Sequence, residues 1–324
     1  MQERALKSSV VIPNRIEDGI YANMDHDLVY RPARALGSTD HKKLLSNPSD
    51  YWWESPLNLN RPAEKSTEAT EQGTAYHVCT LKGEKAFAAE YMRGPDYHDT
   101  MTSGEKGAAT RAAKAEAAKY GKKLLNAADY DDVVIRSTMI SKNPKLATAF
   151  QGGAPEISIF WTRDGIQRKA RLDYLKPRGV GDLKTITNTL DISFPAACRN
   201  AIARWRYEIQ AGLYLEARSM IPQFYAEGRF DGDDNFRELL RKCAEQKTYA
   251  FQFVFLQRDR APITFSRVLS PNNPILEIAR REIDVAVENY KDYLQRFGEE
   301  QWLLIEDPQE LDMSEMPAYW GRDL

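Results

Sequence analysis

The fold is decided by residues 180–186, which read VGDLKTI and have the apolar character of a buried strand. Side chains alternate between the two faces of a strand, so Asp182 and Lys184 are expected on the same face. Burying a carboxylate and an ammonium group costs solvation free energy, so such a pair needs a reason. The two residues are either solvent-exposed polar side chains that alternate with apolar ones on an edge strand, or they form a catalytic pair. We favour the catalytic interpretation, in which the lysine positions a water, helps to deprotonate it and stabilises negative charge in the transition state.

A second carboxylate precedes this strand. Asp173 lies on the apolar segment 169–175, and it either pairs with the nearby Arg171 or joins Asp182 in one site. Together with the main-chain carbonyl of Leu183, the two carboxylates would form an oxygen-rich site of the kind that Mg²⁺ or Mn²⁺ prefers. Such a site is suited to metal-assisted hydrolysis of a phosphodiester. We therefore predict Mg²⁺, or alternatively Mn²⁺, as the cofactor.

A long amphipathic helix is predicted after the strand, over residues 200–220. Gln210 and Tyr214 lie four positions apart and therefore share one face of this helix. They either form the polar rim of the helix or lie against the site, where they would hydrogen-bond the backbone of the cleaved strand or hold Lys184. Three arginines in the same region either contact phosphate groups or face solvent, namely Arg199, Arg204 and Arg206.

The remaining pattern predicts an α/β fold, in which a mixed central sheet is flanked by helices and preceded by a helical region. Strand-like segments at 156–162 and 166–175 flank Asp164 and Gly165, which form a typical hairpin turn. Further strands are expected at 249–257 and 263–269, and helices at 235–246 and 274–297. The expected parts are an irregular segment (1–35), a helical region (36–153), the α/β core (154–304) and a tail (305–324), together one compact domain.

Helix signals fill the region before the core. Thr102 and Glu105 fit a capping box that opens a helix running to about residue 127. Asn143-Pro144 has the form of a helix cap followed by a first-turn proline. Other helices are expected at 38–47, 66–81 and 130–141. His77 lies on the second of these, four residues after Gly73, whose missing side chain would allow a close approach to a strand or a metal ion.

Taken together, these pieces resemble the PD-(D/E)xK nuclease superfamily, and within it the RecB/RecE-like exonucleases, the exonuclease VIII type in particular. The pieces that carry the resemblance are GTAYH at 73–77, RLD at 171–173, GDLKT at 181–185 and QAGLY at 210–214, with a similar lead-in at 44–51. The resemblance spans about residues 36–215. It implies a restriction-endonuclease-like core and a divalent-metal-dependent deoxyribonuclease.

The resemblance also implies roles for single residues. By itself His77 would be read as a hydrogen-bonded core histidine, but the family pattern makes it a metal ligand beside Asp173, Asp182 and the carbonyl of Leu183. A histidine ligand favours Mn²⁺ somewhat over Mg²⁺. The residues given a catalytic role are Asp173, Asp182, Lys184, Gln210 and Tyr214. Glu156 is expected near the metal, either supporting a ligand or as an additional acid.

Bulk properties narrow the class of protein. The chain has 324 residues and a formal net charge of −2, so it does not bind nucleic acid by bulk positive charge. Its three cysteines, Cys79, Cys198 and Cys243, are too few for a four-cysteine zinc or iron–sulfur site within one chain. No run of about 18 apolar residues predicts a membrane span, and no apolar stretch near the N-terminus predicts a signal peptide. We expect a cytoplasmic protein, bacterial or phage-encoded.

The resemblance leads us to expect an exonuclease that degrades duplex DNA from its ends, 5′ to 3′, in phage-type recombination or repair. The implied partners are double-stranded DNA ends, a single-strand annealing protein and further copies of the chain in a tetrameric ring. An endonuclease of the same superfamily and a DNA-binding protein without cleavage activity are the alternatives. Residue spacing does not separate these modes, nor DNA from RNA as substrate.

Overall fold

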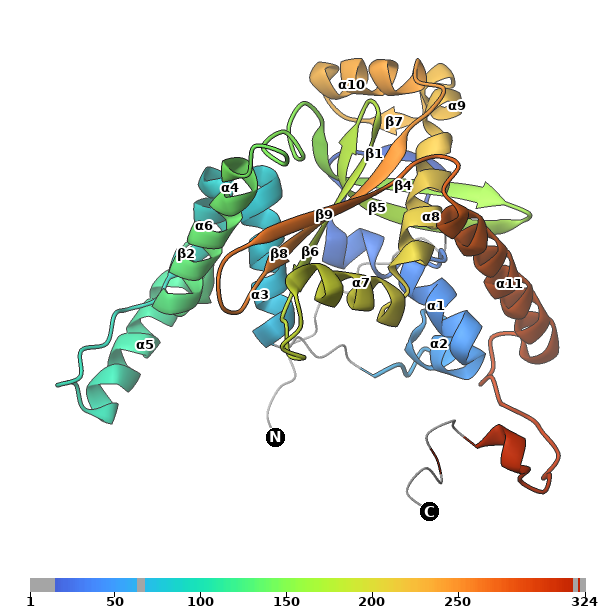
Figure 1. Ribbon diagram of the computed structural model, residues 1–324, viewed down its shortest axis with the longest axis horizontal. Coiled ribbons are helices and arrows are strands. Elements are labelled where there is room, and N and C mark those ends of the chain that lie inside the picture. The colour runs from blue at the N-terminus through green and yellow to red at the C-terminus, as the bar shows by residue number, and fades with distance from the viewer. Residues whose placement is uncertain (1–14, 63–67, 317–319, 321–324) are drawn as a thin grey trace, which may run out of the picture.

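A mixed seven-stranded sheet forms the centre of the computed structural model, which describes residues 15–62, 68–316 and 320 (Figure 1). The strand order is β7-β1-β4-β5-β6-β8-β9. The strands are β1 (Gly19–Tyr21), β4 (Ala154–Arg163), β5 (Ile166–Lys176), β6 (Gly179–Ile186), β7 (Phe230–Asp231), β8 (Ala250–Gln257) and β9 (Thr264–Leu269). The predicted α/β fold with a mixed sheet is therefore confirmed.

The strand connections follow from turn chemistry. β4 and β5 form the predicted hairpin, and Asp164 and Gly165 at its tip have φ of 53° and 78°. Positive φ at both central residues matches the right-handed twist of the paired strands. β5 and β6 are also antiparallel, whereas β6 and β8 are parallel and are joined by a helical crossover. β9 then returns antiparallel to β8.

Helices cover both faces of the sheet, and they surround the β6 strand that carries Asp182. α7, α8 and α11 lie on one side, and α3 and α6 lie on the other (Figure 1). The helices are α1 (Ser38–Ser46), α2 (Pro48–Glu54), α3 (Glu68–His77), α4 (Glu84–Glu90), α5 (Ser103–Lys119), α6 (Ala127–Lys142), α7 (Phe194–Arg204), α8 (Tyr207–Ser219), α9 (Ile221–Ala226), α10 (Asp234–Ala244) and α11 (Pro274–Phe297). The described helices include none that is long and apolar enough to cross a membrane.

Side-chain alternation on β6 places the polar pair in the layer under α8. Val180 and Ile186 belong to the hydrophobic core on that side, so Asp182 and Lys184 between them face the same way. Leu183 faces the opposite core, together with Ile140 of α6. The acid and the lysine thus lie on the α8 side of a buried strand.

The front half of the chain differs from the expectations in four places. The segment expected to be irregular, 1–35, contributes β1, which pairs with β4 and β7, although residues 1–14 lie outside the described residues. The region expected to be helical, 36–153, also holds a small parallel sheet of β2 (Tyr91–Arg93) and β3 (Lys123–Leu125). The capping box at Thr102 is present, but its helix ends at Lys119, and residues 144–150 after Asn143-Pro144 form turns instead of a helix.

The predicted helix over residues 200–220 is two helices, α7 and α8. The break lies at Arg206, which adopts a left-handed conformation with φ 53° and ψ 48°. A non-glycine residue takes this conformation at a free-energy cost, so the break is held by its surroundings rather than by intrinsic preference. Arg206 is fixed by Glu208 and Glu282, and the break allows α8 to set its own direction against the sheet.

Candidate active site

The candidate site forms where β5 and β6 separate. Their main-chain pairing includes Tyr174 with Gly181 and ends there, so Asp173 and Asp182 are the next residues on the two strands. The Leu183 N–H donates to Asp173 Oδ2 at 2.9 Å, so a side-chain carboxylate replaces the missing main-chain acceptor. In a strand the N–H and C=O of one residue point to the same neighbour. The Leu183 carbonyl therefore also faces this opening.

The alternation of faces on β5 breaks at Asp173. Leu172 packs in the core under α8, whereas Tyr174 packs with Leu183 in the core on the other face of the sheet. On the adjacent strand β4, Glu156 stands opposite this point and has φ of 55°. This local distortion lets the Asp173 carboxylate reach both β6 and α3.

Asp182 is the most deeply buried acid of the site, with no exposed surface. Its Oδ1 accepts a hydrogen bond from Gln210 Nε2 at 2.9 Å. Its Oδ2 lies 2.6 Å from Lys184 Nζ as an ion pair but receives no well-directed hydrogen bond. Burial raises the pKa of Asp182, and the negative charge of Asp173 raises it further. The Lys184 ammonium group lowers it, and the resulting pKa is about 6. The buried carboxylate is thus short of positive charge.

His77 closes the site from the end of α3. Its Nε2 lies 3.3 Å from Asp173 Oδ2, and its Nδ1 donates to the Gly73 carbonyl at 3.0 Å. Burial lowers the pKa of His77, but the Asp173 carboxylate and the Gly73 carbonyl outweigh it and raise the pKa to about 9. A Cβ on Gly73 would meet nothing within 4 Å, so this glycine does not serve a close approach to a strand, and an approach to a metal ion stays a prediction.

Helix α8 supplies three side chains on one face, Tyr207, Gln210 and Tyr214. Gln210 holds Asp182, and the buried Tyr214 is hydrogen-bonded to Gln210. The ring of Tyr207 lies 4.8 Å from Lys184 Nζ. Burial lowers the pKa of Lys184, but Asp182 and Asp173 outweigh it and hold the pKa above its usual value, so Lys184 stays an ammonium ion. Sequence reasoning missed Tyr207, although its position three residues before Gln210 predicts the shared face.

Glu156 lies beside the acid cluster and is bound to other groups. Its Oε2 lies 2.6 Å from Lys82 Nζ and 3.3 Å from Arg171 Nη2. Burial raises the pKa of Glu156, but Lys82 and Arg171 outweigh it and lower the pKa. Its carboxylate is therefore a partner of two cations and not part of the Asp173–Asp182 pair.

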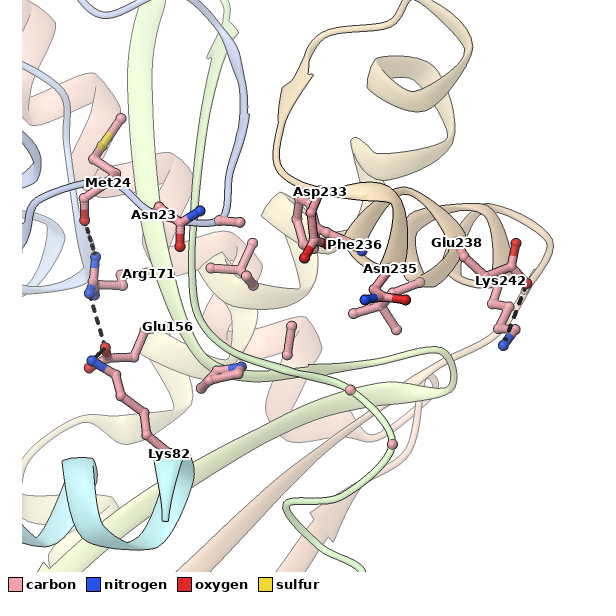
Figure 2. Close-up of a pocket in the computed structure, with 17 residues that line it drawn as sticks. Asn23, Met24, Lys82, Glu156, Arg171, Asp233, Asn235, Phe236, Glu238 and Lys242 are labelled. Atoms are coloured by element: carbon pink, nitrogen blue, oxygen red, sulfur yellow. Dashed lines mark hydrogen bonds and ion pairs between the residues drawn. The ribbon is translucent and has the colours of Figure 1, made fainter. Parts of the chain in front are cut away.

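A cavity of about 850 Å³ adjoins the candidate site at Glu156. Figure 2 shows Glu156, Arg171 and Lys82 at one end of it and side chains of α10, including Asn235 and Lys242, at the other. Asp173 and Asp182 are not among the residues that line it. The cavity is a neighbour of the acid cluster and does not enclose it.

The three arginines predicted near the site differ in whether their side chains are free to contact a phosphate. Arg206 is committed to Glu208, 2.9 Å away, and to Glu282, so it is not a free cation for phosphate. Arg199 and Arg204 are exposed on α7, and Arg204 lies over the ring of Trp205. A phosphate contact of Arg199 or Arg204 stays a prediction.

The donor set suits a divalent metal ion. In the part of the chain that the structure describes, no three or more His, Cys, Asp or Glu side chains form a ready-made metal cluster. Asp173, Asp182 and the Leu183 carbonyl nevertheless supply oxygen ligands at one opening, and Asp182 Oδ2 is a buried oxygen without a directed donor. Oxygen ligands of this kind favour Mg²⁺ or Mn²⁺, and His77 would add a nitrogen.

Comparisons with known proteins place the chain in a family. A comparison with curated proteins finds no match. A crystal structure described as "Putative exonuclease", from Eubacterium rectale, is similar at a TM-score of 0.46 and 12% identity, covering 80% of this chain and 82% of the other. The family model "PDDEXK-like domain of unknown function (DUF3799)" matches residues 53–227, which hold His77, Asp173, Asp182, Lys184 and Gln210. Because this match spans more than half of the 324 residues, the chain belongs to the PDDEXK-like family DUF3799.

Proposed function

We propose that the protein is a divalent-metal-dependent deoxyribonuclease that hydrolyses phosphodiester bonds. One observation carries the proposal: Asp173 and Asp182 stand together where β5 and β6 separate, and Lys184 of the same strand lies 2.6 Å from Asp182. Membership of a PDDEXK-like family supports it, because that name denotes this order of acids and lysine. A protein that only binds DNA would have no need for a buried acid–acid–lysine set.

The metal ion would be held by Asp173, Asp182, the Leu183 carbonyl and His77, and it would supply positive charge to the phosphate and acidity to a water. Lys184, held as an ammonium ion, donates hydrogen bonds to the attacking water and to the phosphate oxygens as their charge grows.

Gln210 has a positioning role in this proposal. Its hydrogen bond fixes one oxygen of Asp182, which leaves the other oxygen directed towards Lys184. Tyr214 holds Gln210 in turn. The α8 face thereby fixes the orientation of the carboxylate on which the site depends.

The mode of attack is a finer proposal, supported by the resemblance to RecE-type exonucleases. The enzyme would degrade linear duplex DNA from its ends, 5′ to 3′, in recombination or repair, and would leave single strands for an annealing protein. A ring of several copies would keep a chain of net charge −2 attached to DNA between cuts. An endonuclease of the same superfamily is the alternative.

Substrate form distinguishes these modes. The purified protein is incubated with Mg²⁺ or Mn²⁺ and three substrates: linear duplex DNA labelled at the 5′ or 3′ end, closed circular duplex DNA, and RNA of the same sequence. Loss of the 5′ label from linear DNA with intact circles supports the exonuclease. Rapid nicking of circles supports the endonuclease instead, and absence of cleavage of any DNA with either metal refutes the proposed function.

A further inference from the structure

A second lysine faces the same aromatic ring as Lys184. Lys42 of α1 places its Nζ 5.4 Å from the centre of the Tyr207 ring, and Lys184 places its Nζ 4.8 Å from the same centre. Both distances lie within the range of cation–π contacts. α1 packs against α8, whose Gln210 holds Asp182. α1 also precedes the segment that the family model matches, so Lys42 reaches the site from outside that segment.

Lys42 has no anionic partner among the described residues. Its ammonium group makes no hydrogen bond and no ion pair there, although the side chain is partly buried. Glu208 is the acid of α8 that acts on it electrostatically, but Arg206 holds that carboxylate at 2.9 Å. The adjacent Lys43, by contrast, is paired with Glu54. Lys42 is thus a free cation beside the candidate catalytic lysine.

Two like charges against one ring are a free-energy cost that an anion would remove. Burial and the Lys184 charge lower the pKa of Lys42 to about 8. An anion that accepts a hydrogen bond from Lys42 would neutralise this ammonium group and so reduce its repulsion with Lys184. A phosphodiester is such an anion, and it repeats along the substrate of a nuclease.

We propose that Lys42, which lies against the Tyr207 ring beside Lys184, binds the phosphate group of the nucleic-acid strand that neighbours the phosphate that is cut. The inference rests on the proposed nuclease function and adds a substrate contact to it. Lys42 acts on binding: it neutralises one phosphate and takes no part in proton transfer.

The test compares Lys42→Ala with a matched control on the same helix, Lys43→Ala. Binding of a labelled DNA duplex is measured by fluorescence anisotropy in EDTA at several salt concentrations, and cleavage is measured separately with Mg²⁺ or Mn²⁺. Lys42→Ala should weaken binding roughly tenfold and reduce the salt dependence of affinity by about one phosphate contact. It should raise KM by a similar factor, change kcat by less than about threefold, and leave a fold that circular dichroism does not distinguish from wild type.

The outcomes separate this inference from the function on which it rests. Lys42→Arg should restore most of the affinity, and Lys43→Ala should bind like the wild type. Wild-type affinity and an unchanged salt slope in Lys42→Ala overturn the phosphate contact while the nuclease proposal stands. A lower kcat with unchanged binding overturns it as well. If the wild type cleaves no DNA, the proposed function fails, and the binding data alone then decide whether Lys42 meets phosphate.

Discussion

Asp182→Asn should make the metal-free protein more stable while abolishing cleavage. Asparagine keeps an oxygen for the Gln210 amide but removes a charge that is buried in the wild type. Lys184 would retain Asp173 as a nearby negative charge, so the exchange does not isolate the ammonium group. The variant therefore removes mainly the cost of burying the Asp182 carboxylate.

The expected difference in the free energy of unfolding follows from the pKa of Asp182. A carboxyl with an ordinary pKa of 3.8 that is raised to about 6 binds its proton more tightly in the native state than in the unfolded chain. The wild type without metal therefore loses stability as pH rises through the window from about 4 to 6. At 1.36 kcal/mol per pKa unit the full loss above pH 6 is roughly 3 kcal/mol. Asp182→Asn has no carboxylate at this position, so its stability does not fall in this way as pH rises.

The assay is urea or thermal unfolding of both proteins in EDTA, from pH 4 to pH 7.5. At pH 7 the variant should be more stable by roughly 3 kcal/mol, and this difference should shrink towards zero near pH 4. Addition of Mg²⁺ or Mn²⁺ should stabilise the wild type and not the variant. A wild type at least as stable as the variant at pH 7 in EDTA, or a difference that does not change with pH, refutes the reasoning.

Other predictions concern the remaining site residues. Lys184→Ala should keep DNA and metal binding but lose about a hundredfold or more in cleavage rate, on the order of 3 kcal/mol; normal turnover with weaker binding would make it a binding residue only. Gln210→Ala should lower kcat about tenfold with little change in KM, because Asp182 loses its fixed orientation; a change confined to KM would contradict a positioning role. Arg206→Ala should leave DNA affinity unchanged because Glu208 and Glu282 already hold this side chain; a clear loss in anisotropy would reverse that assignment.

Local pattern was enough to predict the centre of the fold. The alternation of Asp182 and Lys184 within an apolar strand, and the Asp164-Gly165 turn before it, depend only on side-chain periodicity and on φ preference. These features are present in the structure because the short-range preferences of the chain and its tertiary packing favour the same conformation. The helix after the strand was predicted to lie against the site, but the partner of Gln210 was not: it was expected to hold Lys184 or the cleaved strand, and it hydrogen-bonds Asp182 instead.

Features that depend on distant contacts escaped the sequence analysis. The break at Arg206 puts a non-glycine residue in a left-handed conformation, which two glutamates stabilise and propensity disfavours. β1 has three residues, and they form a strand because they pair with β4 and β7. Lys42 comes close to Lys184 only because α1 packs on α8, and its sequence neighbourhood contains no sign of this.

The most direct test of the account is cleavage of linear duplex DNA by the wild type and by Asp182→Ala, with Mg²⁺, with Mn²⁺ and in excess EDTA. The wild type should cleave the DNA with either divalent metal and should not cleave it in EDTA. Asp182→Ala should be inactive under all three conditions, with the circular dichroism of the folded wild type. Cleavage at the wild-type rate by Asp182→Ala, or by the wild type in excess EDTA, would contradict the account.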